Sequence, residues 1–118
     1  MPTIKLKRIY EKPDENDGIR ILIDRLWPRG ISKKEANLDY WIKEIAPSHE
    51  LRKHFKQGNI SFSEFKEKYK KELEVGESKA SFERLKKMTN DAKQPITLLY
   101  AAKDKEKNNA QVIMQMIQ

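Results

Sequence analysis

The chain has 118 residues, a length that suits a single domain with a modest hydrophobic core, and it contains no cysteine. The lack of cysteine excludes disulfides, thiolate nucleophiles and Cys-ligated metal centres. The formal net charge of +7 favours anionic partners, although many lysines alternate with glutamates in segments such as "SEFKEKYKKELE", a pattern typical of solvated helix faces. No apolar run approaches the roughly 20 residues that cross a bilayer. No apolar stretch near Met1 has signal-peptide length, so we expect a cytoplasmic protein with no membrane partner.

Two apolar segments near the N-terminus are predicted strands. Residues 3–10 alternate apolar and charged side chains, which indicates a half-exposed strand near a sheet edge. Residues 19–26 begin with a more continuous apolar run and are expected to be covered on both faces. The polar loop between them is short for a crossover, so the relative direction of these strands stays open.

A series of helices is predicted next. Ser32 and Glu35 form a capping box, and the spacing of Leu38, Trp41, Ile42 and Ile45 predicts a helix that stops before Pro47. Ser48 is expected to cap a helix that ends by Gly58. Ser61 and Glu64 form a second capping box, which opens a helix that ends at Gly76. A further helix carries Phe82, Leu85 and Met88.

The clearest buried strand is "PITLLYAA", residues 95–102, and Asp104 is expected to cap a last helix after it. The helical segments join the second strand to this one, and such a right-handed crossover predicts that the two are parallel. We therefore predict an α/β fold over residues 1–118, a single domain with a small, mostly parallel sheet flanked by helices in a three-layer, Rossmann-like arrangement.

Two polar clusters follow the carboxyl ends of these two strands, where ligands bind in open α/β sheets. The clusters are "DRLWPRG" and "AKDKEKNN". If the strands are neighbours, the side chains that face one another across a crevice are Asp24, Arg25, Arg29, Lys103, Asp104 and Asn108.

The residue types in these clusters suit an anionic ligand. Arg25 and Arg29 offer bidentate recognition of phosphate or carboxylate, and Lys103 adds a positive charge beside a helix start. Gly30 allows a positive φ and a close approach of the backbone to the ligand. Trp27 could stack on a planar group, and it could equally be a core or lid residue. Together with Asn108, these residues are the predicted ligand-binding set.

Any catalysis would rest on carboxylates, with Asp24 or Asp104 as the candidate base. The alternative is structural: Asp24 and Arg25 would form an ion-pair network, and Asp104 would be only a helix cap. His49 and His54 stand five residues apart, a poor spacing for a shared metal, so we predict no metal site and no cofactor.

The segments "GIRILIDRLWPRGISK", "WIKEIAPSHELRKHF", "FKEKYKKEL" and "ITLLYAAKD" resemble, in this order, the YeaO-like family, small bacterial proteins classed as a domain of unknown function. The resemblance covers nearly the whole chain and implies one compact, cytoplasmic α/β domain. Family members often carry histidines where this chain has Lys107 and Asn109. If those imidazoles move protons or bind metal, this protein lacks them.

Three functions compete at this point. The first is binding of an anionic small ligand that bears a phosphate or a carboxylate, a class that includes nucleotide-like molecules, with or without catalysis. The second is a nucleic-acid-binding or regulatory module, favoured by the charge of +7 and by Trp27 beside arginines. The third is an interaction protein in which the charged cluster is purely structural.

Overall fold

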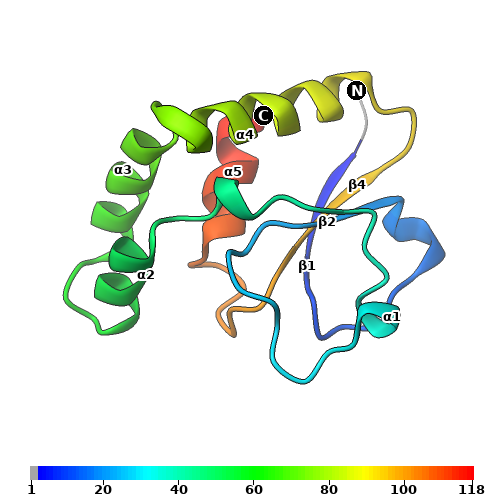
Figure 1. Ribbon diagram of the computed structural model, residues 1–118, viewed down its shortest axis with the longest axis horizontal. Helices are drawn as coiled ribbons and strands as arrows, with labels where there is room; N and C mark the ends of the chain where they lie inside the picture. The colour runs from blue at the N-terminus through cyan, green and yellow to red at the C-terminus, as the bar shows by residue number, and fades with distance from the viewer. Residues whose placement is uncertain (1–2) are drawn as a thin grey trace.

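The computed structural model describes residues 3–118, so the first two residues of the predicted domain lie outside the described range. Within that range one sheet has the strand order β1-β4-β2-β3, and all neighbouring strands are parallel. Figure 1 labels β1, β4 and β2. The strands are β1 (Ile4–Arg8), β2 (Ile19–Leu22), β3 (Tyr40–Trp41) and β4 (Ile96–Tyr100). The last strand therefore lies between the first two. The sequence left the relative direction of the first two strands open. They are parallel, because β1 at the sheet edge and β2 both run parallel to β4.

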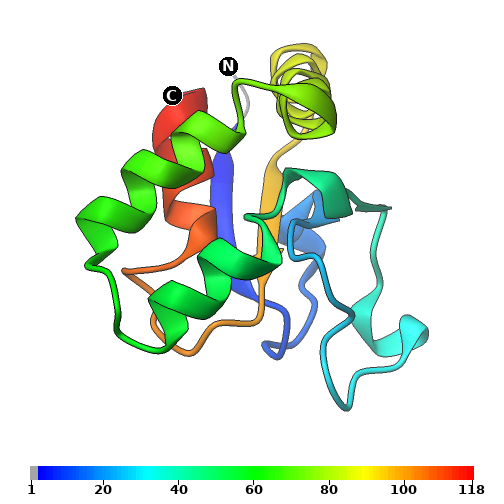
Figure 2. The ribbon, with the colours of Figure 1, turned by 60° about the vertical axis from the view of Figure 1, so that its left-hand side comes forward.

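Five α-helices accompany the sheet in the described residues: α1 (Lys33–Ala36), α2 (His49–Lys56), α3 (Phe62–Glu72), α4 (Gly76–Asp91) and α5 (Asn109–Ile117). Two short 3-10 helices, η1 (Glu15–Asp17) and η2 (Lys43–Ile45), lie in the connections. Helices α2, α3 and α5 lie on one side of the sheet, and α1 lies on the other (Figure 2). The predicted α/β class with a parallel sheet and three layers is confirmed.

The two faces of the sheet bury side chains of different kinds. Alternate residues such as Ile21 and Leu98 enter the larger core, which also receives apolar side chains from α2 to α5. The opposite face carries Leu22 and Leu99, which form a smaller core with α1 and the loop after β2. Because the central strand β4 is buried on both faces, it is apolar at nearly every position, and this explains why its sequence was the clearest strand signal.

The predicted helix over residues 38–45 is wrong. The structure has the two-residue strand β3 there, followed by η2. Leu38 and Trp41 pack into the smaller core, whereas Ile42 and Ile45 enter the larger one, so the apolar stripe is divided between two faces of the sheet. Pairing of β3 with β2 satisfies the hydrogen-bonding groups of the extended backbone, and this tertiary contact overrides the helical spacing of the apolar residues.

The helix starts are predicted well, and the exceptions are informative. Ser32, Ser48 and Ser61 each accept a hydrogen bond from a backbone N–H in the first turn of their helix, as expected of N-caps. Gly76, predicted to end a helix, instead begins α4 at φ +59°. Asp104 does not cap α5. Asn108 does, and its side chain accepts from the Gln111 N–H at 2.9 Å.

Candidate functional site

The two polar clusters meet because β2 and β4 are neighbours that run in the same direction. Leu22 pairs with Leu99, and the Ile23 N–H continues the ladder by donating to the Leu99 carbonyl at 3.1 Å. One step further on, the Ala101 N–H donates to the Asp24 carboxylate at 2.9 Å. The carboxyl ends of the two strands are thus joined by a side chain of the first cluster, which brings the segments after residues 22 and 100 to one edge of the sheet.

A cavity of about 650 Å³ opens at this edge, and we call it the strand-end pocket. Its walls come from the residues after β2, the turn before α2, the helices α2 and α3, and the segment that joins β4 to α5. The lining residues are Asp24, Arg25, Ala46, Pro47, Arg52, Phe55, Lys56, Phe65, Ala101, Ala102, Lys103, Asp104, Lys107, Asn108 and Asn109. Its size falls within the range of roughly 300–1,000 Å³ that is usual for small-molecule sites.

Five cations line the strand-end pocket: Arg25, Arg52, Lys56, Lys103 and Lys107. Among the described residues, the ion pairs involve other cations, at Lys7, Arg20 and His54. The pocket cations therefore have no acidic side chain within ion-pair distance in the described structure. Arg25 is half-buried and donates from Nη2 to the Ala46 carbonyl at 3.0 Å, which holds its stem against the wall.

Asp24 lies at the junction of the two strands and α5. Its Oδ2 accepts from the Ala101 N–H, and its Oδ1 accepts from the Asn109 Nδ2 at 3.0 Å. Burial raises the pKa of the Asp24 carboxyl, against the opposing effects of the Asn109 and Ala101 hydrogen bonds and the Arg52 charge. Both oxygens are thus engaged in holding the strand ends together.

Asp104 is exposed, and its Oδ1 accepts from the backbone N–H groups of Glu106 at 2.9 Å and Lys107 at 3.0 Å. These two hydrogen bonds, with that from Lys107 the stronger influence, lower the pKa of Asp104. Asp104 therefore shapes the turn before α5 and is ionised at neutral pH. Asn108 is buried, donates to the Asp104 carbonyl at 2.8 Å and caps α5.

The structure brings together five of the eight predicted site residues and separates the other three. Asp24, Arg25, Lys103, Asp104 and Asn108 line the strand-end pocket, whereas Trp27, Arg29 and Gly30 are absent from its walls.

The three separated residues follow Asp24 and Arg25 in the loop. Trp27 donates from Nε1 to the Ile31 carbonyl, and its ring meets that of Trp41 edge-on with centroids 5.3 Å apart in the smaller core. Arg29 is exposed, and its carbonyl accepts from the Tyr10 hydroxyl. Gly30 has the expected positive φ of +79°.

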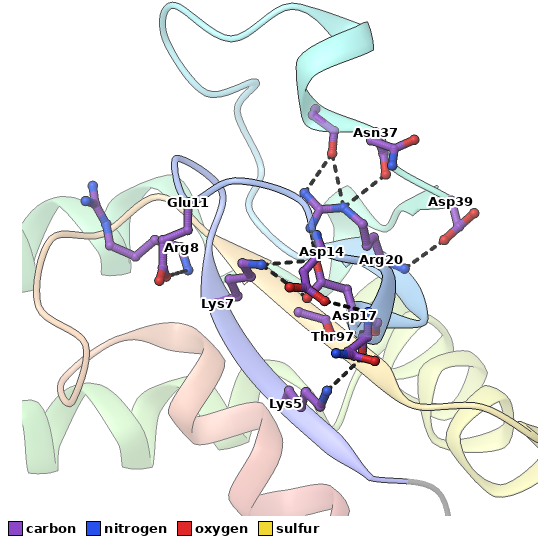
Figure 3. A network of polar contacts seen from close by, with 12 residues as sticks. Lys5, Lys7, Arg8, Glu11, Asp14, Asp17, Arg20, Asn37, Asp39 and Thr97 are labelled. Atoms are coloured by element: carbon purple, nitrogen blue, oxygen red, sulfur yellow. Dashed lines mark hydrogen bonds and ion pairs between the residues drawn. The ribbon is translucent and has the colours of Figure 1, made fainter.

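A second group of charges lies on the opposite face of the sheet (Figure 3). The guanidinium of Arg20 donates to the Asp17 carboxylate and to the Ala36 and Asn37 carbonyls. Asp17 also accepts from Lys7 Nζ at 3.1 Å. We call Lys7, Asp17 and Arg20 the buried charge network. It fastens η1 and α1 to the sheet.

Sequence reasoning missed the contribution of α2 and α3 to the strand-end pocket. Arg52, Phe55 and Lys56 share one face of α2 by their spacing of three and four, and that spacing was visible in the sequence. What was not visible is that this face of α2 packs beside the strand ends. Asn109, noted only as a departure from the family pattern, proves to be the partner of Asp24.

In residues 3–118, no group of three or more His, Asp or Glu side chains is arranged to hold a metal ion. No helix in this part of the chain is long and apolar enough to cross a membrane. A second hollow of about 550 Å³ lies beside α2 and α3, but Glu50 and Glu72 line it together with Lys68 and His54. Its lining therefore sets two carboxylates against one lysine and one histidine, whereas the lining of the strand-end pocket sets five cations against two acids.

Comparison with known proteins identifies the family. Residues 3–118 match the family described as the inactive DUF488-N3 subclade. Uncharacterized protein YeaO of Escherichia coli (strain K12) is 46% identical over 111 residues, which cover 93% of this chain and 92% of YeaO. Uncharacterized protein Rv3073c of Mycobacterium tuberculosis (strain ATCC 25618 / H37Rv) is 33% identical over 114 residues, 97% of this chain and 92% of that protein. No solved structure matches significantly. The chain belongs to the inactive DUF488-N3 subclade, and the predicted membership of the YeaO-like family of small bacterial proteins is confirmed.

Proposed function

We propose that the protein binds a small anionic ligand, one that carries a phosphate or a carboxylate, in the strand-end pocket. The observation that carries the proposal is the set of five cationic side chains around one cavity, none of them ion-paired within the described residues. Cations gathered without acidic partners repel one another, and an anion relieves that repulsion. Arg25 and Arg52 supply guanidinium groups, which suit bidentate contacts with phosphate or carboxylate.

The two acids of the pocket do not cancel this charge. Asp24 and Asp104 give two negative charges at most against five positive ones, and both carboxylates already accept hydrogen bonds from the protein. These contacts also bear on catalysis, because both oxygens of Asp24 hold the strand ends together and the lowered pKa of Asp104 makes its carboxylate a weaker general base. The description of the family as inactive supports the same view. We therefore propose binding without turnover.

The proposal is tested by titrating phosphate, pyrophosphate and citrate into the protein while its melting temperature is measured. A ligand specific to the native state stabilises it by about 2.7 kcal/mol at a concentration of 100 times Kd. Arg52→Gln should weaken binding about tenfold, since charge-assisted hydrogen bonds contribute about 1.5–3 kcal/mol. Lys53→Gln is the matched control, because Lys53 is an exposed neighbour on α2 that does not line the pocket.

A second pair of variants checks the other wall. Lys103→Gln should weaken anion binding, whereas Lys105→Gln, two residues further along the same segment, should leave it unchanged because Lys105 is not among the lining residues. The proposal fails if no anion of the panel raises the melting temperature. It also fails if both control variants lose as much affinity as Arg52→Gln and Lys103→Gln.

Nucleic acid is the second candidate partner, and the formal charge of +7 favours it. Phosphate contacts make such binding strongly dependent on salt. Titration of single-stranded and duplex DNA or RNA at about 50 mM and about 200 mM salt separates the candidates. A small ligand held by few contacts should lose little affinity over that range, whereas a nucleic acid held by 6–10 phosphate contacts should lose roughly 10³- to 10⁵-fold.

A further inference from the structure

The strand-end pocket has an apolar wall that an inorganic anion would leave uncovered. Phe55 and Phe65 both line the cavity, next to Ala46 and Pro47. Phe65 is only 2% exposed, whereas Phe55 is half-buried and keeps part of its ring open to the cavity. The side chains that hold the charge and those that form an apolar surface therefore face the same space. A ligand that fills this space needs both an anionic group and an apolar body.

The apolar wall is built from stacked rings. Phe55 and Phe65 have ring centroids 4.5 Å apart and planes inclined by 24°. Phe62 belongs to the same aromatic cluster, with its centroid 5.8 Å from that of Phe55, but it does not line the pocket. The stack thus starts with a fully buried ring, Phe65, and continues to Phe55 at the cavity. A planar group placed against Phe55 would extend the stack, with the offset geometry that aromatic rings prefer.

The charged groups around this stack come from two segments of the chain. Arg52 and Lys56 lie three residues before and one residue after Phe55 on α2, and Lys103 and Lys107 come from the segment after β4. A ring on Phe55 would therefore place an attached anionic group among cations. Trp27, the aromatic residue that the sequence suggested for stacking, packs against Trp41 in the smaller core. Of the two aromatic side chains that line the strand-end pocket, Phe55 is the more exposed and therefore the better placed to contact a ligand.

Building on the proposed anion site, we propose that the ligand is an aromatic anion, a phosphate or carboxylate attached to a planar ring that stacks on Phe55. The ring covers the apolar wall, and Arg52 and Lys103 hold the anionic group. Nucleobase-bearing phosphates belong to this chemical class, and so do simple aryl phosphates and aryl carboxylates.

The test compares phenyl phosphate with methyl phosphate by isothermal titration calorimetry on the unaltered protein. The two probes share their anionic group and differ in the ring, so the inference expects phenyl phosphate to bind at least tenfold more tightly. Cyclohexyl phosphate, which is apolar but not planar, should bind more weakly than phenyl phosphate. Benzoate, which has the ring with a carboxylate, shows which anionic group the cations prefer.

Variants locate the ring. Phe55→Leu should weaken the binding of phenyl phosphate about tenfold and leave the binding of methyl phosphate unchanged. Phe62→Leu, in the same aromatic cluster but outside the pocket, should leave both affinities unchanged. If circular dichroism shows that Phe55→Leu is unfolded, Phe55→Met replaces it. The comparison of phenyl, cyclohexyl and methyl phosphate on the unaltered protein tests the aromatic inference without any variant. Equal affinities for phenyl, cyclohexyl and methyl phosphate would overturn the aromatic inference and leave the anion site standing. If none of these phosphates and no benzoate binds, the aromatic inference falls, and the anion site falls with it when phosphate, pyrophosphate and citrate also fail to bind.

Discussion

Replacement of Arg20 by methionine probes the buried charge network, because it removes the guanidinium and keeps most of the apolar stem. The Arg20 side chain is 3% exposed. Its Nη2 donates to the Ala36 carbonyl at 2.8 Å, its Nε donates to the Asn37 carbonyl at 3.0 Å, and its Nη1 pairs with Asp17. One side chain thus joins β2 to η1 and to the end of α1 (Figure 3).

The expected loss follows from what the variant leaves behind. Asp17 keeps Lys7 at 3.1 Å, so its charge is not left alone, but the carbonyls of Ala36 and Asn37 lose their donor. Removal of one partner of a buried ion pair costs about 3–5 kcal/mol when the other charge is left uncompensated, and because Lys7 remains beside Asp17 the variant belongs near the lower end, about 3 kcal/mol. We expect the free energy of unfolding to fall by that amount, a large part of the roughly 5–15 kcal/mol that stabilises a folded domain.

The assay is urea unfolding followed by circular dichroism and by the fluorescence of Trp27 and Trp41, which lie in the smaller core near α1. Arg20→Lys, which keeps the charge and loses the planar fork, should fall between the wild type and Arg20→Met. Arg29→Met is the matched control on an exposed arginine, with an expected change within about 0.5 kcal/mol. A loss below about 1 kcal/mol for Arg20→Met, or an equal loss for Arg29→Met, would refute the reasoning.

Two further predictions concern stability. Gly18→Ala should cost more than about 4 kcal/mol or prevent folding, because its φ is +67° and an added Cβ would lie 2.0 Å from the Pro95 carbonyl oxygen. Gly30→Ala, at φ +79° with no atom within 4 Å of the new Cβ, should lower the free energy of unfolding by about 1–2 kcal/mol. Equal losses for Gly18→Ala and Gly30→Ala in urea unfolding would contradict this account. The pKa of Asp17 is affected first by burial, which raises it, but hydrogen bonds from the Asp14 backbone, Lys7 and Arg20 outweigh this and lower it below its ordinary 3.8. Its contribution to stability is therefore complete above that value and is lost as the pH falls through the lower folded pKa. Urea titrations at several pH values below about 5 should show this loss in the wild type and a smaller one in Arg20→Met, and identical acid dependence would count against the network.

The parts of this fold that depend on neighbours in sequence are the parts that the sequence predicts. Ser48 caps α2 through an N–H three residues away, and β4 is recognisable because both of its faces are buried. The segment over residues 38–45 fails because its conformation depends on β2, a strand distant in sequence, to which β3 pairs.

The residues of the strand-end pocket likewise divide into those that local sequence predicts and those that depend on distant packing. Asp24 and Lys103 are predictable because each follows a parallel strand, and the carboxyl ends of neighbouring parallel strands share an edge. Arg52 and Phe55 are not predictable in this way, since their place in the pocket depends on how α2 packs beside that edge. Trp27 follows the same strand as Asp24, but the loop turns it to the other face, where Trp41 and the Ile31 carbonyl hold it.

The position of β4 between β1 and β2 has a consequence for the order of events in folding. Within the described chain, β1 pairs with β4, and β2 pairs with β4 and with the two residues of β3. During synthesis, most of the sheet must therefore wait until residues 96–100 have left the ribosome, since only then do β1 and β2 find the strand that joins them. Such contacts between distant parts of the chain make folding slow and leave strand edges exposed in the meantime. The strand-end pocket, which needs the segments after both β2 and β4, comes into existence at that same late moment.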